Sequence, residues 1–405
     1  MAQPNQFITT QLVSNTALAE FANNSPYVMT ASRMYQGDFQ KSGYKIGDVL
    51  QVRRQNNFIV GDGATAVEQP IIETVENITV AHQYHVFISY TIQDLTLRIE
   101  DFNREFIQPA IQNIIAQMEL DVSSAAEQEL YLFTGQAGTP INSFGTVDLA
   151  GAKLLEMAVN IAANSYMAMT VRDGSSLKQG LLGNFTPVIN EDIVRTSAIG
   201  HVSYFDVFQS QNIVRHVAGL GATTYATDTL TVNGSVTAGN TIILAGATDT
   251  ITNYFLPGDL ISIAGVDSVN PKTRRSTGQN MQFVITAPAN SSGAGAVTIS
   301  VQPTIISDTG SPLQNVSNPI PTGAAVTTVP NYNVNVAYPM RGLDIVCPPL
   351  YKLQVPYSNV AIDPETGLSM AVTQIGDINS YQNKMRIDLL CGFSWHPQYC
   401  VKVLS

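Results

Sequence analysis

Residues 258–278, GDLISIAGVDSVNPKTRRSTG, are typical of a long block of uniform amino-acid composition in this 405-residue chain. The apolar run LISI at 260–263 predicts a strand, and the Asn, Pro and Gly that follow predict a turn. The segment 270–278 is also the densest positive cluster of the sequence, because it holds Lys272, Arg274 and Arg275. We therefore expect a strand that leads into a basic loop.

The same composition extends over residues 221–339, where Thr, Val, Ile, Gly, Asn and Ser dominate. Strand-like runs recur between Gly, Pro and Asn, at 229–232, 241–244, 260–263, 282–285 and 296–301. Short strands at this spacing are typical of a sandwich or barrel, and no helix is expected. Because a mixed α and β character precedes and follows the block, we predict an all-β domain inserted into an α+β host.

Strands of the host are predicted from alternating side chains and from turn residues. The segments 48–53 and 71–80, with Gly61-Asp62-Gly63 between them, predict a long hairpin-like excursion. Further strands are expected over 84–90, 202–213, 361–375 and 385–393.

The strongest helical pattern runs from about residue 100 to 132, with apolar residues three and four apart. A helix of that length spans roughly 45–50 Å and needs a long partner surface. Pro109 removes one backbone hydrogen bond, so it should kink this helix or mark its true start. Shorter helices are expected over 14–22, over 148–163 with Asp148 as N-cap, and over 190–196 with Asn190 as cap.

The composition restricts the kind of surface the protein has. Hydrophobic residues make up 44% of the chain and charged residues only 13%, against roughly 25% charged in ordinary soluble proteins. One interpretation is simply a β-rich or secreted protein, and the other is a surface covered by neighbouring subunits. The net charge of −11 argues against tight nucleic-acid binding, although loose contact with packaged DNA is compatible with it.

The sequence also bears on location. The N-terminus MAQPNQFITTQLV has no signal-peptide pattern, and no run of 18 apolar residues predicts a membrane span. Cys347, Cys391 and Cys400 are odd in number and confined to the C-terminal part. We expect buried thiols in a reducing compartment.

Two patterns could carry chemistry. Asp308-Thr309-Gly310 matches the catalytic triplet of aspartic proteases, but that chemistry needs two carboxylates and the chain has one copy, so a polar turn is favoured. Cys391, His396 and Cys400 could bind zinc, but the spacing is loose and no fourth ligand follows, so buried thiols are favoured. His82 and His85 should face opposite sides of a strand. We expect no enzyme activity, metal or cofactor.

Several segments resemble the coat proteins related to that of Salmonella phage P twenty-two. They are residues 29–39, 45–53, 199–212, 258–278 and 376–392. One departure is Tyr204, which stands where relatives often have glycine. The resemblance implies the shell fold named for phage Hong Kong 97. Its expected parts are an N-terminal arm (1–40), an extended β-hairpin loop with peripheral strands (41–90), a spine helix with the peripheral domain (91–134), an axial core (135–220 with 340–405) and an inserted β-barrel (221–339).

The resemblance further implies a major capsid protein. Such a protein would self-assemble into hexamers and pentamers of an icosahedral head around double-stranded DNA of a tailed phage. It would be made in the host cytoplasm, would meet a scaffolding protein, a portal and a possible decoration protein, and would meet no membrane. The alternatives are another phage or cell-surface structural protein with a β-domain, and a hydrolase that uses Asp308. Lys272, Arg274 and Arg275 form the candidate inter-subunit contact loop, because a neighbour's acidic residues could pair with them; a solvated turn is the alternative.

Overall fold

The computed structural model describes residues 10–35, 49–54, 56–60, 68–69, 71–91, 103–161, 164–182, 199–355, 357–363, 367–377 and 382–405. The chain forms two units. The first contains Met1–Val52, Glu76–Val122 and Leu343–Ser394, and the second contains Arg53–Val75, Ser123–Gly342 and Trp395–Ser405. In the described ranges, every helix is too short or too polar to cross a membrane.

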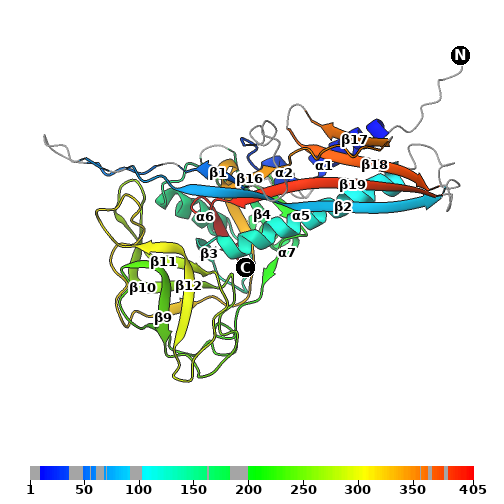
Figure 1. The fold of residues 1–405 in the computed structure, drawn as a ribbon. Helices are drawn as coiled ribbons and strands as arrows, with labels where there is room; N and C mark the ends of the chain where they lie inside the picture. Colours follow the sequence, from blue (N-terminus) through cyan, green and yellow to red (C-terminus); the bar gives the residue numbers. More distant parts are fainter. Residues whose placement is uncertain are drawn as a thin grey trace, which may run out of the picture. The chain divides into compact units, whose positions relative to one another are not determined.

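The first unit contains a six-stranded sheet, whose long strands β2 and β19 are seen in Figure 1. Its order is β1-β2-β19-β18-β17, and β16 pairs with β19. The strands are β1 (Val49–Arg53), β2 (Val75–Thr91), β16 (Leu343–Val346), β17 (Tyr357–Ile362), β18 (Ser369–Asp377) and β19 (Gln382–Trp395). The expectation of separate strands at 71–80 and 84–90 was wrong. They are one continuous strand that begins at Val75, because no turn residue interrupts Ala81-His82-Gln83.

Helices cover one face of this sheet. They are α1 (Thr10–Asn24), α2 (Pro26–Thr30) and α5 (Gln108–Glu129), the last preceded by one π-helical turn, Asn103–Ile107. α1 packs on β17 and β18, and the Tyr84 hydroxyl of β2 donates to Asp121 of α5 at 2.8 Å. Pro109 is the second residue of α5 and follows the π-helical turn almost directly, so it marks the place where the α-helical hydrogen-bond pattern begins. The helix expected over 14–22 is confirmed within α1.

The second unit contains the barrel-like sheet, whose order is β13-β10-β11-β12-β9-β8. The strands are β8 (Thr231–Val232), β9 (Ala238–Ala245), β10 (Leu260–Val269), β11 (Ser276–Ile285), β12 (Val297–Ile306) and β13 (Val326–Thr328). A bridge between Thr231 of β8 and Ala325, next to β13, joins the two ends of the sheet. Alternate side chains fill the interior, among them the fully buried Ile242, Ile263, Phe283 and Ile299. The predicted helix-free character is confirmed.

A second sheet of this unit, in the order β3-β20-β15-β4-β6-β5, forms the host. Its strands are β3 (Phe133–Gly135), β4 (Ser165–Thr170), β5 (His201–Val202), β6 (Phe205–Ser210), β15 (Asn335–Pro339) and β20 (Val401–Leu404). Helices α6 (Phe144–Glu156) and α7 (Val171–Leu182) pack on it. β15 was expected inside the insertion, but it pairs with β4 and β20 of the host.

The chain leaves and re-enters the host at one place. β7 (Arg215–His216), just before the barrel, pairs antiparallel with β14 (Tyr332–Asn333), just after it. The Ala218 amide also donates to Asn331 Oδ1 at 2.8 Å. Two neighbouring connections are what an inserted domain requires, since the host must continue across the gap.

The helix expected over 148–163 is shifted. α6 begins after Ser143, whose hydroxyl accepts from the Thr146 amide at 3.3 Å, and it ends at Glu156. Asp148 is therefore not the N-cap, and its carboxylate instead accepts from Ser203 at 2.7 Å. Ser143 offers the same capping chemistry one turn earlier, which the sequence interpretation overlooked. The helix expected over 190–196 lies outside the described residues.

Candidate functional site

The basic loop is the turn between β10 and β11. Asn270 organises it, because its Oδ1 accepts from the amides of Lys272 and Thr273, each at 3.0 Å. The Arg274 amide then donates to the Asn270 carbonyl at 2.8 Å. Arg274 has φ +57°, the left-handed conformation that closes the turn. Hydrogen bonds within the loop itself therefore fix its conformation.

The three basic side chains of this loop differ in their contacts and in their exposure to solvent. Arg274 donates to the carbonyl oxygens of Ser311 at 2.8 Å and Thr309 at 2.6 Å, and to Gln314 Oε1 at 2.9 Å. Lys272 and Arg275 are exposed. Arg274 therefore fastens the turn to a second loop of the same barrel, and Lys272 and Arg275 remain as the outward charges of the loop.

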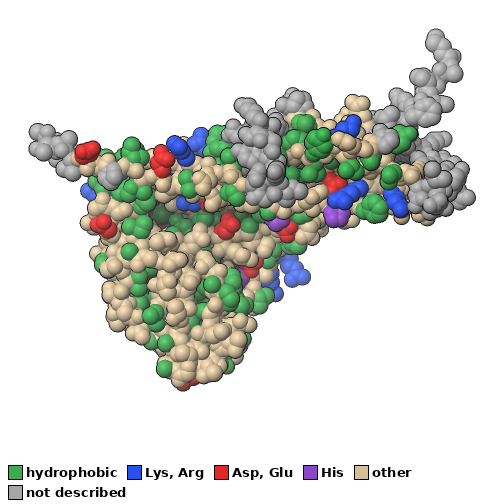
Figure 2. Space-filling model, in the orientation of Figure 1, with side chains coloured by type: hydrophobic (Ala, Val, Ile, Leu, Met, Phe, Trp, Pro, Cys, Tyr) green, Lys and Arg blue, Asp and Glu red, His purple; other side chains and the backbone are tan. Residues whose placement is uncertain are grey.

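The triplet at 308–310 has the geometry of a polar turn. The carboxylate of Asp308 accepts from the amide of Gly310, two residues on, at 2.8 Å, and the side chain is exposed. This local bond is the ordinary use of Asp in a turn. Figure 2 shows that the visible face of the barrel carries few charged side chains.

The cysteines that were candidates for a zinc site are buried thiols. Cys347, Cys391 and Cys400 are buried and form no disulfide with one another, as expected. Hydrogen bonding to Cys347, together with burial, raises the pKa of the Cys391 thiol well above its ordinary value. In the part of the chain that the structure describes, no group of three His, Cys, Asp or Glu side chains could hold a metal ion.

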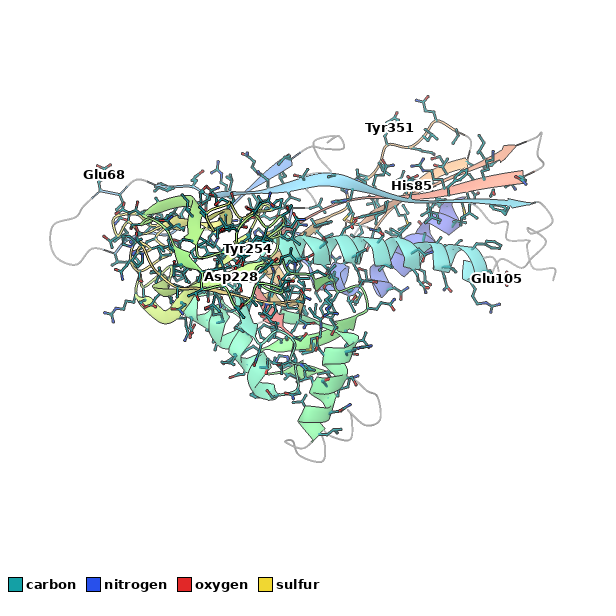
Figure 3. The ribbon with its side chains drawn as sticks, turned by 90° about the horizontal axis from the view of Figure 1, so that it is seen from below. Glu68, His85, Glu105, Asp228, Tyr254 and Tyr351 are labelled. Atoms are coloured by element: carbon teal, nitrogen blue, oxygen red, sulfur yellow. The ribbon has the colours of Figure 1, made fainter. Side chains whose placement is uncertain are left out.

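His82 and His85 point to opposite faces of β2, as predicted. The His82 ring stacks on Phe393 with 5.0 Å between ring centroids, and its Nδ1 lies 3.9 Å from Asp121 Oδ2. His85, labelled in Figure 3, is exposed and lies opposite Asp388 of β19.

A buried charge cluster lies beside the β7–β14 pair, where the barrel joins the host. It was not predicted from the sequence. The ring of His216 lies between two carboxylates, with Nδ1 2.6 Å from Glu127 Oε1 and Nε2 2.7 Å from Asp259 Oδ1. Lys402 Nζ donates to the Glu127 carbonyl at 2.6 Å and to the Tyr332 hydroxyl at 3.2 Å. The Tyr332 hydroxyl donates to the Gly258 carbonyl at 2.8 Å. The side chains of His216 and Asp259 are only 2% and 1% exposed.

These residues come from separate parts of the chain. Glu127 lies on α5, His216 on β7, Asp259 just before β10, Tyr332 on β14 and Lys402 on β20. The only signals in the sequence are Asp259, an acidic residue in a block almost without charge, and Lys402, a lysine within the apolar run of β20. Neither identifies its partner.

At the departure from the resembled pattern, Ser203 takes the left-handed conformation with φ +55°. The Tyr204 ring packs on Gly151 of α6, where a Cβ would lie 2.4 Å from Tyr204 Cδ2. The turn before β6 therefore forms without a glycine at 204.

A comparison with models of known protein families gives a match over nearly the whole chain. A model of the family described as "P22 coat protein - gene protein 5" matches residues 1–399. None of the curated proteins is significantly similar to the chain.

Solved structures that match the chain include two phage structures and one coat protein domain. One, from "Mycobacterium phage Che8", has a TM-score of 0.46 and 10% identity over 95% of this chain and 90% of that chain. The "Capsid of Ralstonia phage GP4" has a TM-score of 0.45 and 6% identity over 89% of this chain and 84% of that chain. The "CUS-3 coat protein I-domain" has 25% identity and a TM-score of 0.18, and it covers 25% of this chain and 96% of that chain. With TM-scores this low, the family match carries the assignment.

Proposed function

Because its match over residues 1–399 shows that the chain belongs to the P twenty-two coat protein family, we propose that it assembles into hexamers and pentamers. These close into the icosahedral head around the double-stranded DNA of a tailed phage. The family match is the single observation that carries this proposal. The scaffolding protein, the portal and a decoration protein are the further partners we propose, with assembly in the host cytoplasm.

The chain is a phage coat protein, and its place is the shell of the virion. Its architecture is α+β with an additional barrel-like sheet, and we propose that the α+β part is the shell fold of the Hong Kong 97 type. The family and the fold are those of a structural protein, which favours a function in the capsid over a hydrolase that uses Asp308.

The parts of the shell fold belong to the same proposal. We assign the arm to residues 1–40, the extended loop with peripheral strands to 41–90, the spine helix with the peripheral domain to 91–134, and the axial core to 135–220 with the C-terminal part. The insertion begins near 221 and ends between β13 and β14, since β15 already pairs in the host sheet.

Exposed apolar side chains support repeated contacts between subunits. In the first unit Tyr351 is 86% exposed and Phe87 is 59% exposed, and in the second unit Val60 is 90% exposed. Burying such side chains contributes roughly 25 cal/mol per Å² of apolar area. Weak contacts suffice in a shell, because each subunit repeats them with several neighbours at once.

Electron microscopy of the purified full chain, alone and co-expressed with a scaffolding protein from the same phage, tests the proposal. The expected particles are closed shells, or capsomers of six and five subunits. A chain that folds, as judged by a cooperative unfolding transition, and yet stays monomeric under both conditions would overturn the proposal.

For the basic loop we propose a contact between subunits that uses Lys272 and Arg275. Replacing both with Glu should reduce the yield of shells and leave the unfolding transition unchanged, because both side chains are exposed. The charge-preserving pair Lys272→Arg with Arg275→Lys is the matched control and should assemble like the wild type. Equal shell yields from the charge-reversed and control variants would refute the contact.

A further inference from the structure

The buried charge cluster joins the barrel to the host where the chain leaves and re-enters. His216 and Tyr332 are Cα partners in the β7–β14 pair, and their ring centroids lie 4.8 Å apart. Asp259 belongs to the turn that opens β10 of the barrel, and its carboxylate also accepts from the amides of Leu256 at 2.8 Å and Gly219 at 3.2 Å. Glu127 lies near the C-terminal end of α5. One imidazole ring therefore connects the barrel to the helix of the host.

The geometry of the two contacts indicates how many protons the His216 ring carries. Both ring nitrogens of His216 lie within 2.7 Å of a carboxylate oxygen. A neutral imidazole has one N–H and can donate to only one of them, which leaves its lone pair facing the other carboxylate. The doubly protonated ring donates to both, and such charge-assisted bonds are short and strong.

The groups around His216 affect its pKa in opposite directions. Burial lowers the pKa of His216, but the hydrogen bonds and negative charges of Asp259 and Glu127 outweigh burial and raise it above the ordinary value. Tyr332 remains a neutral hydroxyl, because burial raises its pKa. Lys402 is the other basic group of the cluster; burial lowers its pKa to about 7, although Glu127 and Asp259 act in the other direction.

We propose that the doubly protonated His216 ring is a latch that holds the inserted barrel on α5 and the β7–β14 pair, and that loss of one ring proton loosens this junction while the barrel itself stays folded. The device acts through the connection between barrel and host and does not depend on the assembly proposed above.

The direction of the effect follows from the raised pKa of His216. Its contribution to stability is fully present below the unfolded value of about 6.5 and is lost as pH rises through the higher folded value. Lys402 acts in the opposite direction. Its pKa in the folded protein is lowered to about 7, so the free-energy cost of burying its charge falls as pH rises above about 7. A pH profile of global stability mixes the two groups, so a local measurement and two variants are needed.

Hydrogen exchange of the full chain at pH 6 and pH 9, corrected for intrinsic exchange rates, provides the local measurement. The reporter is the Val334 amide, which donates to the Val214 carbonyl at 3.0 Å beside the cluster, and the reference is the β11–β12 pairing inside the barrel. In the wild type and in Lys402→Met, the reporter should exchange about tenfold faster at pH 9 than at pH 6, and the reference should not change. In His216→Gln, the reporter should exchange fast at both values.

Reporter protection that is equal at both pH values in the wild type would overturn the proposal. Loss of protection in reporter and reference together would also overturn it, because the whole unit would then be opening. If His216→Gln does not fold, ¹⁵N spectra of the histidine rings in the wild type decide. The chain has five histidines, and one of them should stay doubly protonated at a pH above the ordinary histidine pKa of about 6.5. Five rings that all lose the second proton at or below that ordinary value would refute the latch.

Discussion

The guanidinium of Arg274 lies against the carbonyl oxygen of Ser311, with 2.8 Å between Nη1 and the oxygen. A side chain expected to reach a neighbouring subunit is thus engaged within its own barrel, where it ties the β10–β11 turn to the loop that contains Thr309 and Gln314. Lys272 and Arg275, which flank Arg274, are exposed. Basic residues in one short loop therefore have separate roles, and variants can separate them.

Replacing Arg274 with Ala should lower the free energy of unfolding by about 1–3 kcal/mol, because hydrogen bonds from a charged donor are lost and carbonyl acceptors are left without it. The backbone cost at φ +57° is the same for Arg and Ala, so it does not contribute. Arg275→Ala is the matched control and should change stability by less than about 0.5 kcal/mol. Denaturant unfolding measures both, and equal effects would show that Arg274 does not hold the second loop.

Gly258 is required at its position by both conformation and space. It has φ +96°, and a Cβ there would lie 3.0 Å from His216 Cε1 and 3.2 Å from Glu127 Cγ. Gly258→Ala should therefore destabilise the protein by more than the roughly 1–3 kcal/mol of backbone strain alone. Gly278→Ala provides the control, since Gly278 has φ +72° and no atom within 4 Å of such a Cβ. Thermal unfolding of both variants gives the difference, and a Gly278 variant as unstable as the Gly258 variant would contradict the close contact.

Local patterns predicted those parts of the fold that depend on local interactions. The three-and-four spacing of α5 and the short β-branched runs of the barrel express which side of each element is buried, so they identify these elements directly. Ser143 and Val75 show where this reasoning was insufficient. The start of α6 depends on which of two competing capping residues is used, and the length of β2 depends on its pairing with β19, residues 382–395, far along the chain.

The His216 cluster could not be predicted for a different reason. Its residues come from separate segments of the chain, and nothing in any one segment identifies the others. The pairing of β7 with β14 brings His216 and Tyr332 together, and tertiary packing adds Glu127, Asp259 and Lys402. The opposite problem affected Arg274. Its clustering with Lys272 and Arg275 in the sequence indicated a shared outward role, but the left-handed backbone turns its side chain back onto the barrel. Sequence proximity does not determine the direction of a side chain in a tight turn.

In the first unit, Tyr84→Phe should destabilise the packing of α5 on β2. The Tyr84 hydroxyl donates to Asp121 Oδ2 at 2.8 Å, and Gln117 donates to the other oxygen at 3.0 Å. Burial raises the pKa of Tyr84, so the hydroxyl keeps its proton and remains a donor. Loss of this bond to a charged acceptor should lower the free energy of unfolding by about 1–2 kcal/mol. Tyr357→Phe, at a position 63% exposed, is the control and should have almost no effect; a similar loss in both would contradict a specific bond.

Asp228 should make the stability of the barrel depend on pH in the acid range. Its carboxylate accepts from the Thr248 amide at 2.6 Å, from the Thr248 hydroxyl at 3.0 Å and from the Tyr254 hydroxyl at 2.8 Å, and Figure 3 shows Asp228 and Tyr254 side by side. Burial raises the pKa of Asp228, but these hydrogen bonds outweigh burial and lower it below the ordinary value. The stabilisation is therefore present above the unfolded value of about 3.9 and is lost as pH falls through the lower folded value.

The stability gap between the wild type and Asp228→Asn should accordingly be constant above about pH 5 and should narrow as the solution is acidified below about pH 4. The gap should be about 1 kcal/mol, because the carboxylate is partly exposed and solvent weakens its bonds. Tyr254→Phe removes one of the donors, so the part of the stability that depends on pH should shrink in that background. Denaturant midpoints from pH 6 to pH 3 measure all four chains, namely the wild type, both single variants and the double variant. A gap that stays constant down to pH 3 would show that the Asp228 carboxylate is not the group whose ionisation stabilises the barrel.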